Sequence, residues 1–177
     1  MNPFRLSLTV SIFLLTSLLS FSQVTPENAA PPSPASHALY GEFGGPGLAI
    51  SANFDTRLSR RKDGFGIYAG IGTNLSGNPT FLTIPAGVNY LMGNGGNYLE
   101  AGAGLTYGSL VNSTASTRYT IGSKDFYGNH HLLFGNTILG YRRQPTHGGF
   151  NFRVGISPFF GEGAGGVIPY LSIGYNF

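Results

Sequence analysis

IPYLSIGYNF, residues 168 to 177, ends the chain with apolar side chains at alternate positions. The apolar positions are Pro169, Leu171, Ile173, Tyr175 and Phe177, and the residues between the last four are Ser172, Gly174 and Asn176. A period of two is the period of a β-strand, in which successive side chains point to opposite faces. The stretch therefore predicts a strand with one apolar face, and that face includes the final aromatic residue.

The same period of two residues recurs along the chain. It runs through GFGIYAGIGTNL (64–75), TFLTIPAGVNYLMG (80–93), NYLEAGAGLTYGSLV (97–111) and GGFNFRVGISPFFG (148–161). Clusters of glycine, proline, asparagine and charged residues, which are typical of turns, separate these stretches. The pattern predicts an all-β chain without helices. Its eight expected strands are 37–44, 47–58, 64–75, 80–92, 97–111, 129–143, 149–161 and 167–177.

Residues 37 to 58 allow two interpretations. A break at the glycine-rich stretch 44–47 makes them a hairpin of two strands. Alternatively, they form one long bulged strand. Because a barrel whose chain starts and ends on the same side has an even number of strands, the second interpretation requires another strand in the long connection, near Arg118 to Ile121.

Composition decides where such a sheet lies. Charged residues make up 10% of the chain, against about 25% in soluble domains, and aromatic residues at 14% exclude a disordered glycine-rich polymer. Opposite the apolar face, the strands carry mostly Gly, Ser, Thr and Asn, which are too small and too uncharged for a solvated surface. A membrane barrel accounts for both faces, because its apolar face lies against lipid and its small and polar side chains lie inside. We therefore expect a closed antiparallel transmembrane β-barrel of about eight strands.

The first residues predict export. Residues 1–22 combine one charge, Arg5, with a Leu-rich run and a small-x-small pattern before Gln23, which is the layout of a signal peptide. An uncleaved membrane anchor is the alternative, but Ser and Thr interrupt the run and it is short for a span of about 20 apolar residues. Residues 23–36 contain four prolines and predict a flexible leader. The barrel domain is expected at 37–177.

Alternation directs five charged side chains away from the apolar face: Asp55, Arg57, Glu100, Arg142 and Arg153. If the leader and the last strand both lie in the periplasm, all five fall toward the periplasmic end. In a narrow, poorly hydrated lumen, opposite charges are expected to pair and to plug the barrel. The alternative is that they lie unpaired at the water line.

The ending LSIGYNF, with Gly174, Tyr175 and Phe177, resembles the C-terminal signal by which the assembly machinery of Gram-negative bacteria recognises outer-membrane barrels. Residues 37–177 resemble the small eight-stranded outer-membrane barrels of the OmpA/OmpX-like type. The resemblance implies insertion into the outer membrane, with lipid and the barrel-assembly machinery as partners. It implies no particular activity.

Three functions were compared for such a barrel. A structural or surface-interaction role is favoured, with residues 112–128, on the outside, as the site for an extracellular ligand. A lipid-A-modifying acyl hydrolase or transferase needs a nucleophile, a base and a carboxylate, and His130 or His131 near Ser109 and Asp125 is the only possible set. A pore or transporter is limited by the width of eight strands.

The sequence predicts no catalytic, cofactor or metal site. The adjacent His130 and His131 point to opposite faces of a strand, so they cannot bind one metal ion together. The stretch GAGLTYG (102–108) superficially resembles a phosphate loop. No helix is expected after it, so it cannot bind a nucleotide as a phosphate loop does. The small net charge argues against nucleic acid as a partner. We expect a monomer without enzymatic activity.

Overall fold

The structure is a computed structural model that describes residues 37–59, 61–75, 80–111, 118–121, 124–127, 131–145, 148–161 and 164–177. The expected signal peptide (1–22) and leader (23–36) lie outside the described residues. Within these ranges, no helix is long and apolar enough to span a membrane.

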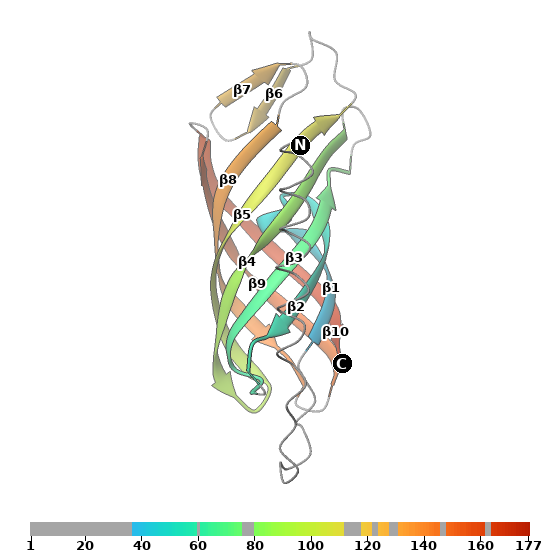
Figure 1. Ribbon diagram of the computed structural model, residues 1–177, viewed down its shortest axis with the longest axis vertical. Coiled ribbons are helices and arrows are strands. Elements are labelled where there is room, and N and C mark those ends of the chain that lie inside the picture. Colours follow the sequence, from blue (N-terminus) through green and yellow to red (C-terminus); the bar gives the residue numbers. More distant parts are fainter. Residues whose placement is uncertain are drawn as a thin grey trace, which may run out of the picture. The chain divides into compact units, whose positions relative to one another are not determined.

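Eight antiparallel strands close into one barrel, which confirms the predicted fold class (Figure 1). Their order around the barrel is β1-β10-β9-β8-β5-β4-β3-β2. The strands are β1 (His37–Gly44), β2 (Ile50–Arg57), β3 (Gly64–Thr73), β4 (Thr80–Asn94), β5 (Asn97–Val111), β8 (His131–Arg143), β9 (Gly149–Gly161) and β10 (Ala164–Asn176).

The first and last strands close the barrel. His37 N–H donates to the Phe177 carbonyl oxygen at 3.1 Å, and Phe177 N–H donates to the His37 carbonyl oxygen at 2.9 Å. Both residues therefore lie at one end, here called the terminal end, together with the connections 58–63, 95–96 and 144–148. The opposite end, called the far end, carries the connections 45–49, 74–79, 112–130 and 162–163.

Residues 37 to 58 form a hairpin, so the interpretation as one bulged strand is wrong. The predicted start of the second strand at residue 47 is also wrong, because Gly45–Gly47 forms a single 3-10 turn, η2, and β2 begins at Ile50. A strand does occur at Arg118–Ile121 (β6), but it pairs with β7 (Lys124–Tyr127) in a separate two-stranded sheet.

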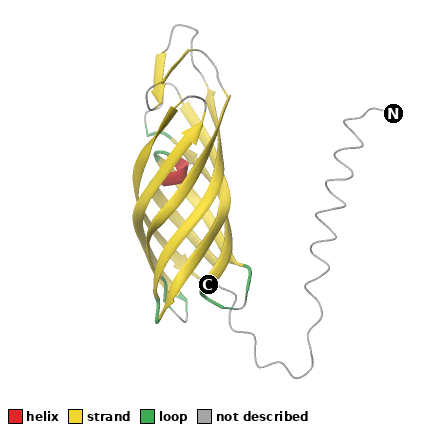
Figure 2. Ribbon diagram, turned by 90° about the vertical axis from the view of Figure 1, so that its left-hand side faces the viewer, coloured by secondary structure: helices red, strands yellow, loops and turns green. Residues whose placement is uncertain are grey.

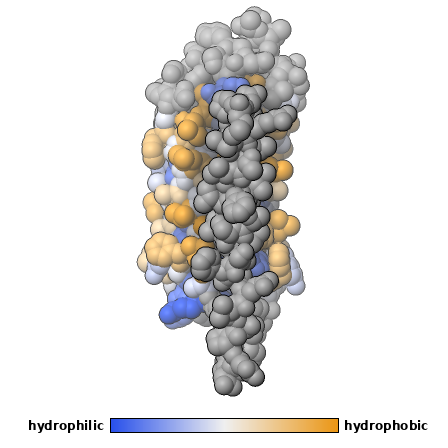
Figure 3. Space-filling model, in the orientation of Figure 1, coloured by the Kyte–Doolittle hydropathy of each residue, from blue (hydrophilic) through white to orange (hydrophobic). Residues whose placement is uncertain are grey.

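The barrel is apolar outside and polar inside. Its outward residues include Ile71, Leu105 and Phe150, which are all more than half exposed, whereas charged and amide side chains are buried in the lumen, together with an apolar cluster around Phe81 and Phe134. Figure 3 shows hydrophobic side chains, in orange, along both flanks that are drawn in colour. This polarity is the inverse of a soluble protein, in which apolar residues are buried.

Inward-facing glycines make room for two tyrosine rings. The hydroxyl of Tyr68 lies over Gly87 and Gly104, and the hydroxyl of Tyr170 lies over Gly140 and Gly155. A Cβ atom at Gly104 would lie 2.3 Å from the Tyr68 hydroxyl, and one at Gly140 would lie 2.2 Å from the Tyr170 hydroxyl. Because interiors are close-packed, larger residues at these positions would displace the rings.

Candidate functional site: the charged lumen

The structure brings all five predicted lumen residues together. Asp55 and Arg57 come from β2, Glu100 from β5, Arg142 from β8 and Arg153 from β9. All are buried inside the barrel, because each occupies an inward position of its strand. The neighbouring order β5-β8-β9 places Arg142 on the strand between those of Glu100 and Arg153.

Glu100 and Arg153 form a two-pronged ion pair. Arg153 Nε donates to Glu100 Oε2 and Arg153 Nη2 donates to Glu100 Oε1, both at 2.9 Å. Asn89 Nδ2 also donates to Glu100 Oε1, at 2.8 Å. Parallel bonds between a guanidinium and a carboxylate are among the strongest polar contacts in proteins.

Asp55 pairs with the other two arginines. Arg57 Nη2 donates to Asp55 Oδ1 at 2.6 Å, and Arg142 Nη1 donates to Asp55 Oδ2 at 3.1 Å. Asn89 joins both halves of the cluster, because its Nδ2 donates to Asp55 Oδ2 as well as to Glu100. The result is one continuous network that crosses the lumen from β2 to β9.

Sequence reasoning missed Glu42 of β1. Its Oε2 lies 3.5 Å from Arg153 Nη1 and accepts a hydrogen bond from Ser172 Oγ at 2.8 Å. The guanidinium carbon of Arg153 also lies 4.2 Å from the centre of the Tyr40 ring, within the range of a cation–π contact. The alternation of β1, with Leu39 and Phe43 outward, was the signal that assigns Glu42 to the lumen.

With Glu42, three carboxylates face three guanidiniums among the buried charged residues that the structure describes. The formal charges of these six groups cancel, so the network needs no counter-ion. Its side chains come from five strands, β1, β2, β5, β8 and β9. Such an arrangement can cross-link the barrel wall and obstruct passage through the lumen.

Of the candidate catalytic set, the structure describes the side chains of Ser109 and His131. Ser109 and His131 are opposite each other in the β5–β8 register, but the His131 Nδ1 atom shares a hydrogen bond of 2.7 Å with the Tyr107 hydroxyl. His130 and the side chain of Asp125 lie outside the described residues. In the part of the chain that the structure describes, no group of three or more His, Cys, Asp or Glu residues could hold a metal ion.

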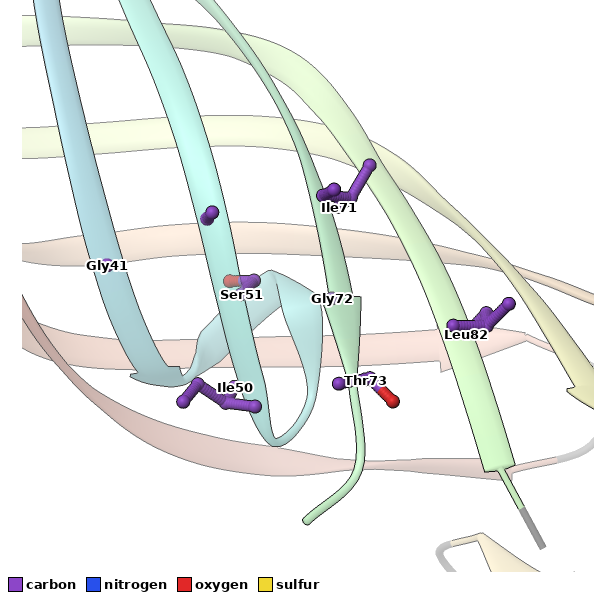
Figure 4. Close-up of a pocket in the computed structure, with 8 residues that line it drawn as sticks. Gly41, Ile50, Ser51, Ile71, Gly72, Thr73 and Leu82 are labelled. Carbon is purple, nitrogen blue, oxygen red and sulfur yellow. The ribbon is translucent and has the colours of Figure 1, made fainter. Parts of the chain in front are cut away.

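A groove of about 460 Å³ lies over β1 to β4, on the apolar side of the barrel wall (Figure 4). Gly41 and Ala52 are direct register partners, and the larger Ile50, Ile71 and Leu82 surround them. The depression exists because two small residues meet at neighbouring outward positions. It contains no charged group.

A second pocket, of about 540 Å³, lies at the β2–β3 connection and includes Phe65 and Tyr90. Arg61 and Asp63 form an ion pair at its rim, with Arg61 Nε 2.9 Å from Asp63 Oδ1. The hydrogen bond from Arg61 lowers the pKa of the Asp63 carboxyl. Both side chains reach solvent, so this pair differs from the buried pairs of the lumen.

The proposed assembly residues lie on or directly after the closing strand. Tyr175 and Phe177 point outward, and the Phe177 ring lies 5.9 Å from the ring of His37. A Cβ atom at Gly174 would lie 2.4 Å from the Tyr40 Cβ, so the pairing of β10 with β1 needs glycine here.

A closed antiparallel barrel with an apolar exterior and ion pairs among its lumen side chains defines the class: a small eight-stranded β-barrel. The solved N-terminal β-barrel domain of Pseudomonas aeruginosa OprF is similar, with a TM-score of 0.56 and 14% identity. The match covers 81% of this chain and 96% of that chain, and it shows the same fold. No protein-family model matches the chain, and no curated protein matches its sequence.

Proposed function

We propose that this protein is a membrane-spanning barrel of the bacterial outer membrane, with a structural or surface-interaction role and a plugged lumen. The inverted polarity supports this proposal above all. Outward residues such as Leu105 are exposed and apolar, while the charged residues of the network are buried. Lipid suits the outward apolar residues as a solvent. Among β-sheets, only a closed barrel leaves no unpaired backbone edge within the membrane.

Two further observations support this location. The fold is that of the OprF barrel domain. Strand length also agrees, because β4, β5 and β8 have 13 to 15 residues, enough for the 9 to 11 residues of a tilted crossing. By contrast, nothing among the described residues favours a lipid-modifying enzyme, and the Nδ1 atom of His131 is hydrogen-bonded to the Tyr107 hydroxyl.

The Phe177→Asp variant is expected to reach the outer membrane at a much lower level than the natural protein. The closing strand would lose the aromatic side chain that we propose for recognition and for anchoring at the membrane interface. Fractionation of cells and the heat-dependent shift in gel mobility measure this. Phe43→Tyr, which keeps an aromatic residue on β1, is the control. A normal level and a normal gel shift for Phe177→Asp would contradict the proposed assembly signal.

The proposed contact site is residues 112–128, of which the structure describes 118–121 and 124–127; they connect β5 and β8, whose joined ends lie at the far end. With both termini of the barrel in the periplasm, this end faces the exterior. An epitope inserted near Ser116 is therefore expected to be tolerated and to bind antibody on intact cells. Antibody binding that requires permeabilised cells would invert the topology. An epitope in the 58–63 connection is the matched control and should need permeabilisation.

A further inference from the structure

The connection between β1 and β2 folds into the barrel. Gly44 and η2 (Gly45–Gly47) are buried, and η2 contacts β3, β4, β5, β8, β9 and β10 as well as β1. Figure 2 shows this turn, in red, within the ring of strands. Connections usually run over the surface, so one that turns inward needs polar partners inside.

Threonine side chains supply these partners. Thr83 Oγ1 donates to the Gly47 carbonyl oxygen at 3.0 Å, and Thr106 Oγ1 donates to the Pro46 carbonyl oxygen at 2.9 Å. Asn136 Nδ2 in turn donates to Thr106 Oγ1 at 2.9 Å. The backbone hydrogen bonds of the turn itself are internal: Leu48 N–H donates to Gly45 and Ala49 N–H donates to Gly47. Among the described residues, side chains thus attach the turn to the wall.

An apolar cluster lies beside the turn. It consists of Phe81, Leu110, Leu132 and Phe134, with Leu48 and Phe159 packed against it. These residues face the lumen near the far end, where the sequence predicted small and polar side chains. That prediction is wrong for this layer, because the inward turn brings Leu48 into the barrel and needs apolar partners there.

The backbone at Leu48 is strained. Its φ of 74° and ψ of −61° are rarely adopted by a residue with a side chain, so the backbone is strained here. Gly44 and Gly45, on the other side of the turn, also have positive φ values, which glycine adopts freely. The turn therefore begins at glycines with positive φ, Gly44 and Gly45, and ends at the strained Leu48.

We propose that residues 45–48 are a movable gate at the far end that controls access from this side to the polar lumen. This inference rests on the proposed function. The charged network is fixed to strands of the barrel wall, whereas the gate is held by threonine hydroxyls and by the packing of Leu48. Release of the strain at Leu48 favours opening, and the hydrogen bonds and the apolar contacts favour closure.

The test uses the absence of cysteine from the chain. Ser157→Cys places one thiol in the lumen, because Ser157 is buried, has no hydrogen-bond partner at its hydroxyl and precedes Phe159 by one inward position on β9. A membrane-impermeant thiol reagent is added to intact cells and, separately, to the purified folded barrel in detergent. The rate of labelling measures how often the gate opens.

Thr83→Val removes a hydrogen bond of the gate and is expected to raise the labelling rate of Ser157→Cys about fivefold, the equivalent of one hydrogen bond. Thr137→Val removes a hydroxyl outside the gate, at the wall contact with Pro158, and should leave the rate unchanged.

If Ser157→Cys is labelled at the same rate with Thr83→Val as with the natural Thr83, the proposed gate is wrong. Fast labelling of Ser157→Cys with Thr83 unchanged would also contradict the gate. Failure of the protein to reach the outer membrane would contradict the proposed function, while the detergent measurement would still report on the gate.

Discussion

Glu100→Ala is expected to lower the free energy of unfolding by roughly 3 to 5 kcal/mol, the range for breaking a buried ion pair. The substitution leaves the Arg153 guanidinium buried without the carboxylate that binds it through two hydrogen bonds of 2.9 Å. Both side chains are 0% exposed, so water does not replace the lost partner. Urea unfolding, followed by circular dichroism in detergent or vesicles, measures the change.

Two controls separate the charge from the volume of the side chain. Asp63→Ala breaks an exposed pair with Arg61 and should change stability little, because solvent screens that pair. The double variant Glu100→Met with Arg153→Met should recover part of the loss, since the Arg153 guanidinium no longer lies buried without Glu100, although Glu42 then loses the guanidinium 3.5 Å from its carboxylate. Equal losses for Glu100→Ala and Asp63→Ala would contradict the assignment of Glu100 to a buried network.

Leu105→Arg is expected to destabilise the folded barrel in lipid vesicles by roughly 2 to 4 kcal/mol, the cost of arginine on the lipid face at the bilayer midplane. Leu105 lies near the middle of β5 and is 57% exposed. Leu99→Arg is the matched control. Leu99 is 61% exposed on the same face of the same strand, but it lies close to the terminal end, where the cost falls to roughly 0 to 1 kcal/mol.

Folding in vesicles, titrated with urea, gives both free energies. The comparison depends on depth alone, because residue type, strand and face are the same in the two variants. Equal losses at the two positions would contradict a bilayer around β5.

The sequence alone determined the faces of the sheet. In NYLEAGAGLTYGSLV, Leu99 and Leu105 share one parity and Glu100 has the other, and each lies on the side that the alternation predicts. Side chains of a strand alternate by backbone geometry, so a correct period decides inside and outside for every residue of the strand. The same logic placed Arg142 and Arg153 inside, and it would have placed Glu42 there.

Tertiary structure decided which lumen residues meet. Glu42 and Arg153 lie 111 positions apart, and their 3.5 Å approach exists only because β1 pairs with β10 and β10 pairs with β9. The inward course of residues 45–49 was also not predictable. GGPG is equally compatible with a turn in solvent, and its burial depends on Thr83, Thr106 and the apolar cluster, which distant strands bring to the same level. A local pattern specifies a residue's own side of the wall, whereas closure of the barrel specifies what it faces across the lumen.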